Sequence, residues 1–198
     1  MSAPKTLASP NHIVCELFQS LRRLCVRIAN LNPDNDAQEI RQDSAIAIIL
    51  SIQCVEVFLN VYFRVVVSEP DFSHAFIKIN SDLHDTKFGL ERKLKDWPKL
   101  VFDKKLDFSS GASQRLKKLK NQRNKLMHFK SSHETILISE IVINGLADTT
   151  SYESLNTQSA IDALSTAEDF LCEIFTLRGI VPENLSHSLH SWTGKPPL

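Results

Sequence analysis

The stretch from Ala45 to Val67, AIAIILSIQCVEVFLNVYFRVVV, decides the fold of this chain. An uninterrupted apolar pattern of this length predicts a long, mostly buried helix. Asp36 followed by Glu39 resembles a capping box that would start the helix, and Ser68-Glu69-Pro70 would end it. A helix of this kind needs other helices around it, so the stretch favours an all-α fold.

The same stretch is also long enough to cross a bilayer. Four polar residues interrupt it, Gln53, Glu56, Asn60 and Arg64. A glutamate and an arginine near the middle of a membrane would each cost about 2.5 to 3.5 kcal/mol. We therefore expect a buried helix of a soluble protein that does not contact a membrane. The start of the sequence has no signal-peptide pattern, so we expect a cytoplasmic protein.

Further helices are predicted on both sides of this one. Apolar spacings of three and four, caps and prolines place them at 10–30, at 87–97 with Pro98 ending the helix, at about 112–130, and at 157–178 with Gly179 as a left-handed terminator. A short helical turn is expected around 74–79. Residues 134–144, ETILISEIVIN, fit either a short strand or a buried helical turn.

These elements predict an all-α protein built as an antiparallel bundle of four to five helices. We expect a single domain over residues 1–181 and a polar, peripheral C-terminal tail over 182–198. The 42% hydrophobic and 23% charged residues exclude a largely disordered chain. The four cysteines stand singly in apolar runs, which predicts buried, reduced thiols and no zinc site.

Positive charge gathers in one part of a chain whose net charge is zero. No acidic residue occurs from Phe108 to His133, and this segment holds Arg115, Lys117, Lys118, Lys120, Arg123, Lys125 and Lys130. The expected helix at 112–130 therefore carries a basic strip.

Arg123 occupies an unusual position on this helix. With 100° per residue and Arg123 at zero, Leu116 falls near 20°, Leu119 near 320° and Leu126 near 300°. Arg123 thus lies within the apolar stripe, where a guanidinium must be paired or must border a solvent-filled cleft. Asn124 and His128 flank the stripe as an i, i+4 pair.

Glu56 is the candidate partner of Arg123, because Gln53, Glu56, Asn60 and Arg64 form one polar row along the long apolar helix. Plainer interpretations remain open. Such a row is often the solvent face of a helix, an arginine in an apolar stripe often extends to water, and a lone histidine at a helix end is more often structural than catalytic.

The string RNKLMH at residues 123–128 resembles the R-x4-6-H signature of HEPN domains, in which a polar residue commonly follows the arginine. SIQCVEVFLNVYF resembles the acidic helix that precedes the motif, and LERKLKDWPKL and LKKLKNQRNKLMHFK resemble the run into it. The resemblance covers roughly Ala45 to Lys130.

Many HEPN proteins are metal-independent endoribonucleases, often toxins or phage-defence effectors, and others bind RNA or nucleotides without cleaving. The resemblance implies that Arg123 and His128 are the catalytic pair, with Asn124 positioning them and Glu56 as a supporting acid. It also implies a homodimer in which two motifs face one cleft, and an antitoxin or regulatory protein as a candidate partner. Charge makes five lysines candidates for RNA binding: Lys117, Lys118, Lys120, Lys125 and Lys130.

The chemistry fits these residue types. A histidine exchanges protons near neutral pH, and an arginine offers a permanently charged fork for phosphate oxygens. No phosphate loop, GxSxG, HExxH or carboxylate triad is present, so we expect no cofactor and no metal. Two alternatives stay open: a non-catalytic HEPN-like module that binds RNA, a nucleotide or a protein, and a structural interaction protein in which Arg123 pairs internally.

Overall fold

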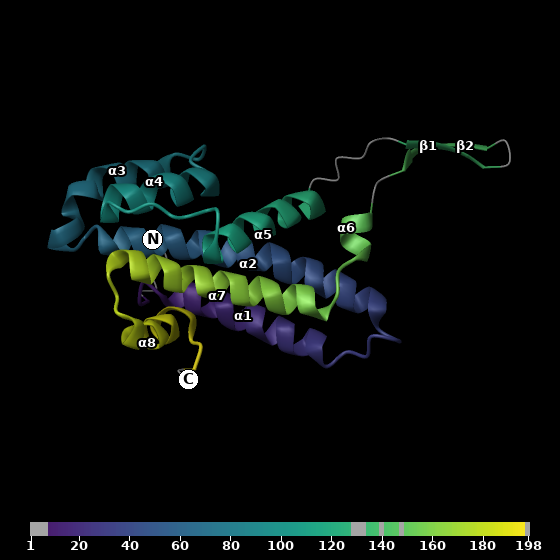
Figure 1. Cartoon of the computed structure of the whole chain (residues 1–198), viewed down its shortest axis with the longest axis horizontal. Helices are drawn as coiled ribbons and strands as arrows, with labels where there is room; N and C mark the ends of the chain where they lie inside the picture. The colour runs from purple at the N-terminus through teal and green to yellow at the C-terminus, as the bar shows by residue number, and fades with distance from the viewer. Residues whose placement is uncertain (1–7, 128–133, 139–140, 147–148, 197–198) are drawn as a thin grey trace, which may run out of the picture.

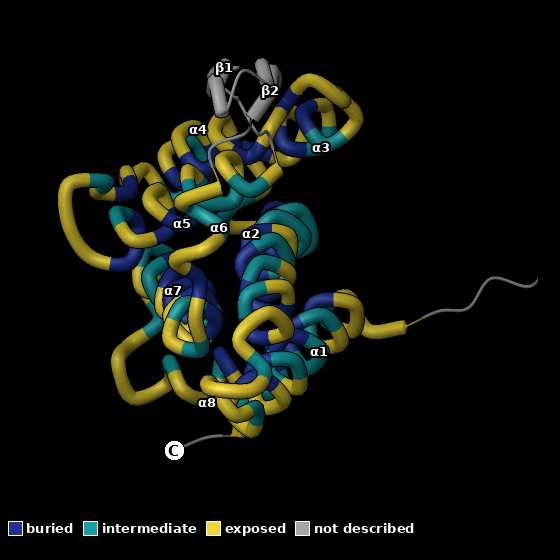
Figure 2. The backbone as a smooth tube through the Cα atoms, turned by 90° about the vertical axis from the view of Figure 1, so that its right-hand side faces the viewer, coloured by how far each residue is buried: buried dark blue, intermediate teal, exposed yellow. Residues whose placement is uncertain are grey.

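The computed structural model describes residues 8–127, 134–138, 141–146 and 149–196. Over these residues the fold is helical apart from one hairpin. The long helix α2 (Ala37–Val66) packs against α1 (His12–Ala29), α7 (Thr157–Arg178) and α5 (Gly111–Met127) (Figure 1). Figure 2 shows the buried segments where α1, α2 and α7 face one another. The all-α prediction is therefore confirmed.

The helix α2 is also long and apolar enough to cross a membrane. About half of its most apolar stretch, 56%, is buried within the protein. A core helix of a soluble protein has the same length and composition, so this feature alone does not decide between the two environments.

Contacts at the helix ends give the directions of the helices. The Ser44 hydroxyl donates to the Asn156 carbonyl (2.9 Å), and Arg178 pairs with Glu69 (2.7 Å). The first contact joins the starts of α2 and α7 and the second lies at their ends, so the two helices run in the same direction. The expectation of a wholly antiparallel bundle is wrong for this pair. The reason is the long crossover between them, in which α5 carries the chain back to the end where α2 began.

The crossover begins with a 3₁₀ helix, η1 (Pro70–Ala75), and continues through α3 (Phe76–His84) and α4 (Leu90–Phe102). Pro98 lies inside α4 and does not end it, contrary to the sequence prediction. The helix continues because its face stays packed. The ring of Phe63 contacts both Trp97 and Phe102 at 5.5 Å, so the proline costs one backbone hydrogen bond but not the packing.

A hairpin follows α5. Its antiparallel strands are β1 (Glu134–Ile138) and β2 (Ile141–Leu146), which decides for a strand in the segment that the sequence left open. After the short α6 (Thr150–Glu153), α7 begins with a capping box formed by Asn156 and Ser159. It ends at Gly179, whose φ of 98° confirms the left-handed terminator.

The expected peripheral tail is largely a helix, α8 (Pro182–Thr193). The ring of Trp192 lies 5.5 Å from that of Phe58 and 5.2 Å from that of Tyr62, so α8 contributes to the aromatic part of the core. With α1 to α8 present, the chain also holds more helices than the four to five predicted. Short spacing of Leu185, Leu189 and Trp192 in a polar sequence hides this helix from a composition argument.

Candidate functional site

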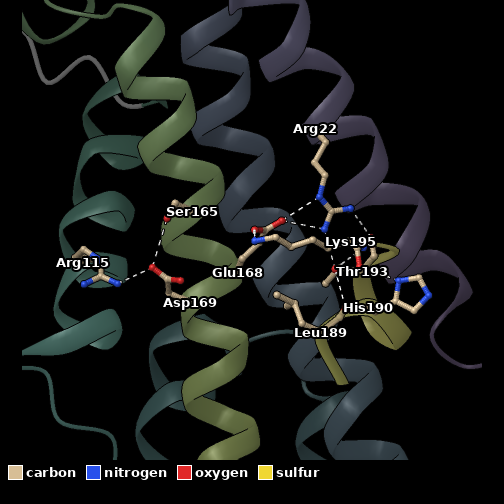
Figure 3. A network of polar contacts seen from close by, with 9 residues as sticks. All are labelled: Arg22, Arg115, Ser165, Glu168, Asp169, Leu189, His190, Thr193 and Lys195. Carbon is tan, nitrogen blue, oxygen red and sulfur yellow. Dashed lines mark hydrogen bonds and ion pairs between the residues drawn. The ribbon is translucent and has the colours of Figure 1, made fainter. Parts of the chain in front are cut away.

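The candidate site lies on α5, which is anchored to α7 in an antiparallel arrangement. The backbone N–H of Ser113 donates to Glu173 (2.8 Å), and Arg115 pairs with Asp169 (2.8 Å; Figure 3). Leu116 is fully buried. These contacts fix the first half of α5, so the residues that follow are held in a defined orientation.

Arg123 is half-buried in the second half of α5. Among the described residues it has no hydrogen-bond or ion-pair partner. Three other half-buried arginines each meet a carboxylate: Arg22 with Glu168, Arg41 with Glu153 and Arg178 with Glu69. Within the described part of the chain, Arg123 thus stands apart from arginines of similar burial. The first of the two options for a guanidinium in an apolar stripe, an internal partner, is not realised there.

The neighbours of Arg123 are open to solvent. Asn124 and Lys125 are exposed, and so is Met127, at 52%. Two members of the predicted site, His128 and Lys130, lie outside the described residues.

Glu56 is not the partner of Arg123, so that expected ion pair is wrong. The carboxylate of Glu56 instead accepts a hydrogen bond from Lys93 in α4 (2.7 Å). The Lys93 side chain is only 8% exposed and needs a counter-charge, which the closest acid on α2 supplies. A signal for Lys93 was present in the sequence, because Leu90, Lys93, Leu94 and Trp97 share one helical face.

The lysines of the basic strip differ in their surroundings. Lys120 pairs with Glu91 in α4 (2.8 Å), and this contact, followed by the charges of Lys117 and Lys95, lowers the pKa of Glu91. Lys117, Lys118 and Lys125 are exposed and, among the described residues, have no ion-pair partner. Lys120 is therefore less available to a ligand than the sequence suggests.

Two hollows border α5. One, of about 450 Å³, lies between α5 and α7, and its lining includes Arg115, Lys118, Gln122 and Asp162. The other, of about 260 Å³, lies between α4 and α5 and is lined by Glu91, Leu94, Lys95, Phe108, Lys117 and Lys120. The adjacent Lys117 and Lys118 thus face different sides of the helix.

A second polar cluster lies on the other side of α7 (Figure 3). Buried Glu168 accepts hydrogen bonds from Arg22 (3.0 Å) and Lys195 (2.6 Å), while Arg22 also donates to the carbonyl of Thr193 (2.6 Å). The charges in this cluster are matched within the chain. It ties the C-terminal segment to α1 and α7, so we assign it a structural role.

No protein-family profile, characterised protein or solved structure shows significant similarity to this chain. Over the residues that the structure describes, no group of three or more His, Cys, Asp or Glu side chains has a geometry suited to a metal ion.

Proposed function

We propose that this chain is a metal-independent endoribonuclease of the HEPN type that acts as a homodimer. The observation that carries the proposal is the half-buried guanidinium of Arg123, which lacks a carboxylate partner among the described residues and sits five residues before His128. A cation that is partly removed from water favours an anionic ligand, and a guanidinium matches phosphate oxygens.

In the proposed reaction, one His128 of the dimer removes the proton from a 2′-hydroxyl, whose oxygen attacks the adjacent phosphorus. The bond from phosphorus to the 5′ oxygen breaks, and the partner's His128 gives that oxygen a proton. The products are a 2′,3′-cyclic phosphate and a 5′-hydroxyl. Arg123 stabilises the charge that develops on the phosphorane, and Asn124 positions the reacting groups.

Two apolar residues at the end of α5 support the homodimer. Met127 is exposed and Leu126 is half-buried, both beside Arg123. A second copy that packs on this end of α5 would remove this apolar surface from water and would bring a second motif to the same cleft.

The test is cleavage of single-stranded RNA and transfer RNA by the full chain, in the presence and absence of a metal chelator. Arg123→Ala and His128→Ala should each lower the cleavage rate by at least about 100-fold while the dimer stays folded. Arg23→Ala and His187→Ala are matched controls, since both residues are exposed and lie on α1 and α8. Both controls should cleave normally.

Cleavage that survives both site substitutions, or that the chelator abolishes, would refute the mechanism. RNA binding that weakens with salt but yields no cleaved product would favour a non-catalytic binding module instead. A protein that binds no RNA would be an interaction protein in which the basic strip is a solvated face.

A further inference from the structure

The hollow between α4 and α5 combines an apolar interior with a basic rim. Leu94 is buried and Phe108 is half-buried, so these two side chains lie deepest in it. Lys95 and Lys117 are exposed at its edge, and Lys120 is held beside them by Glu91. A volume of about 260 Å³ is slightly below that of typical cofactor sites, which leaves room for one planar ring system.

The lysines make this hollow electropositive. Glu91 is itself 83% exposed, yet Lys120, Lys117 and Lys95 together lower the pKa of its carboxyl group. A field that stabilises one carboxylate stabilises another anion placed at the same rim. The hollow therefore suits a ligand with an apolar ring and an attached negative charge.

The hollow lies on the side of α5 that leads to the motif. With Arg123 at zero and 100° per residue, Lys120 falls at about 60°, Asn124 at about 100° and Lys117 at about 120°. Along the helix axis, Lys120 and Lys117 precede Arg123 by roughly 5 and 9 Å. A strand that leaves the hollow along this row would reach Asn124 and Arg123.

The hollow between α5 and α7 is a poorer site for the same ligand. It contains Asp162, and its Arg115 is already paired with Asp169. Its lining has no aromatic residue. Lys118 is the exposed, unpaired cation that this lining offers among the described residues.

We propose that the α4–α5 hollow binds one unstacked base of single-stranded RNA, with the base against Phe108 and Leu94 and its neighbouring phosphates beside Lys117 and Lys95. This inference rests on the proposed function, since it names the form in which RNA approaches the motif. Aromatic side chains that stack on bases, flanked by cations, are a general means of holding single strands.

The experiment measures binding of a fluorescent oligoadenosine RNA to the full chain carrying His128→Ala, so that no strand is cut. Phe108→Ala should weaken binding by about 5- to 140-fold, the range that loss of one base–aromatic stack covers. Phe76→Ala, which removes an exposed phenylalanine of α3, should leave binding unchanged. Phe108→Leu keeps the apolar packing and should weaken binding less, and melting temperatures should show that each variant is folded.

Two further arms separate base recognition from charge. Adenosine 5′-monophosphate should displace the RNA at lower concentration than ribose 5-phosphate does, and Phe108→Ala should remove this difference. Lys117→Ala should weaken RNA binding more than Lys118→Ala, its neighbour on the other side of α5.

Equal displacement by the two phosphates, or equal effects of Phe108→Ala and Phe76→Ala, would overturn the inference even if the unmodified protein cleaves RNA. Base-dependent binding that Phe108→Ala abolishes would support it even if the unmodified protein cleaves nothing, in which case only the proposed nuclease function fails.

Discussion

The ion pair between Glu56 and Lys93 allows a sharp test of how α2 and α4 are held together. Replacing Glu56 by glutamine keeps the size of the side chain and removes its charge, which leaves Lys93 buried without a counter-charge. At 2.7 Å and an effective dielectric constant of about 20, the attraction that is lost is about 6 kcal/mol. Most of it is offset by the hydration that both groups lost on folding.

Breaking a fully buried pair costs about 3–5 kcal/mol. Because Glu56 is 26% exposed and the amide oxygen of glutamine still accepts a hydrogen bond, we expect about 2 kcal/mol for Glu56→Gln. In a chain of this size this free energy corresponds to a fall in melting temperature of about 4–8 °C. Adding Lys93→Met should return the stability to within about 1 kcal/mol of the unmodified protein, since the buried charge is then gone.

The measurements are thermal unfolding of both single variants and the double variant, and RNA cleavage by the double variant. A Glu56→Gln protein that melts like the unmodified one, or a double variant that is less stable than either single variant, would show that the buried-pair reasoning is wrong. Retained cleavage in the double variant is expected if Glu56 serves the fold. A stable double variant that has lost cleavage would return Glu56 to the active site.

Two further predictions concern stability. Gly194→Ala should cost about 1–2 kcal/mol and lower the melting temperature by about 2–8 °C, because φ is 67° there and an added Cβ would lie 2.8 Å from the Gln19 amide; Gly89→Ala, which meets no neighbour, is the control. Burial raises the pKa of Cys25 to about 11 and of Cys54 to about 12, from 9.0. Between pH 9 and these values the folded state binds more protons, so this contribution to stability is complete below pH 9 and is lost as the pH rises; both thiols should resist alkylation at pH 8 until the protein unfolds, and rapid labelling of the native protein would contradict this.

The elements with strong periodicity were predictable from the sequence. α2 and α7 begin and end within a residue of the predicted bounds, because an uninterrupted apolar pattern, a cap and a terminator agree in each. α8 was missed because few apolar residues are needed on a helix that only closes the end of a core. The Pro98 prediction failed because tertiary packing of Trp97 and Phe102 outweighs one missing hydrogen bond.

The site was predictable only in part. The helical wheel identified Arg123 as unusual, and its half-burial agrees with a position at the edge of the apolar stripe. The wheel says nothing about the neighbouring helices, so it could not assign Glu56 to Lys93 or Glu91 to Lys120. The α4–α5 hollow was equally out of reach, since it depends on Phe108 in a loop meeting two helices.

The contrast between Lys93 and Arg123 carries the functional argument furthest. Each cation lies on the apolar face of its helix, and a cation there is kept only where another interaction offsets its lost hydration. Lys93 meets Glu56 within the chain. Arg123 has no such partner among the described residues, and the acid that its sequence pattern suggested is already engaged. We infer that the anion that Arg123 favours comes from outside the chain, and on a helix side lined by Lys117 and Lys120 a phosphate is the anion that fits.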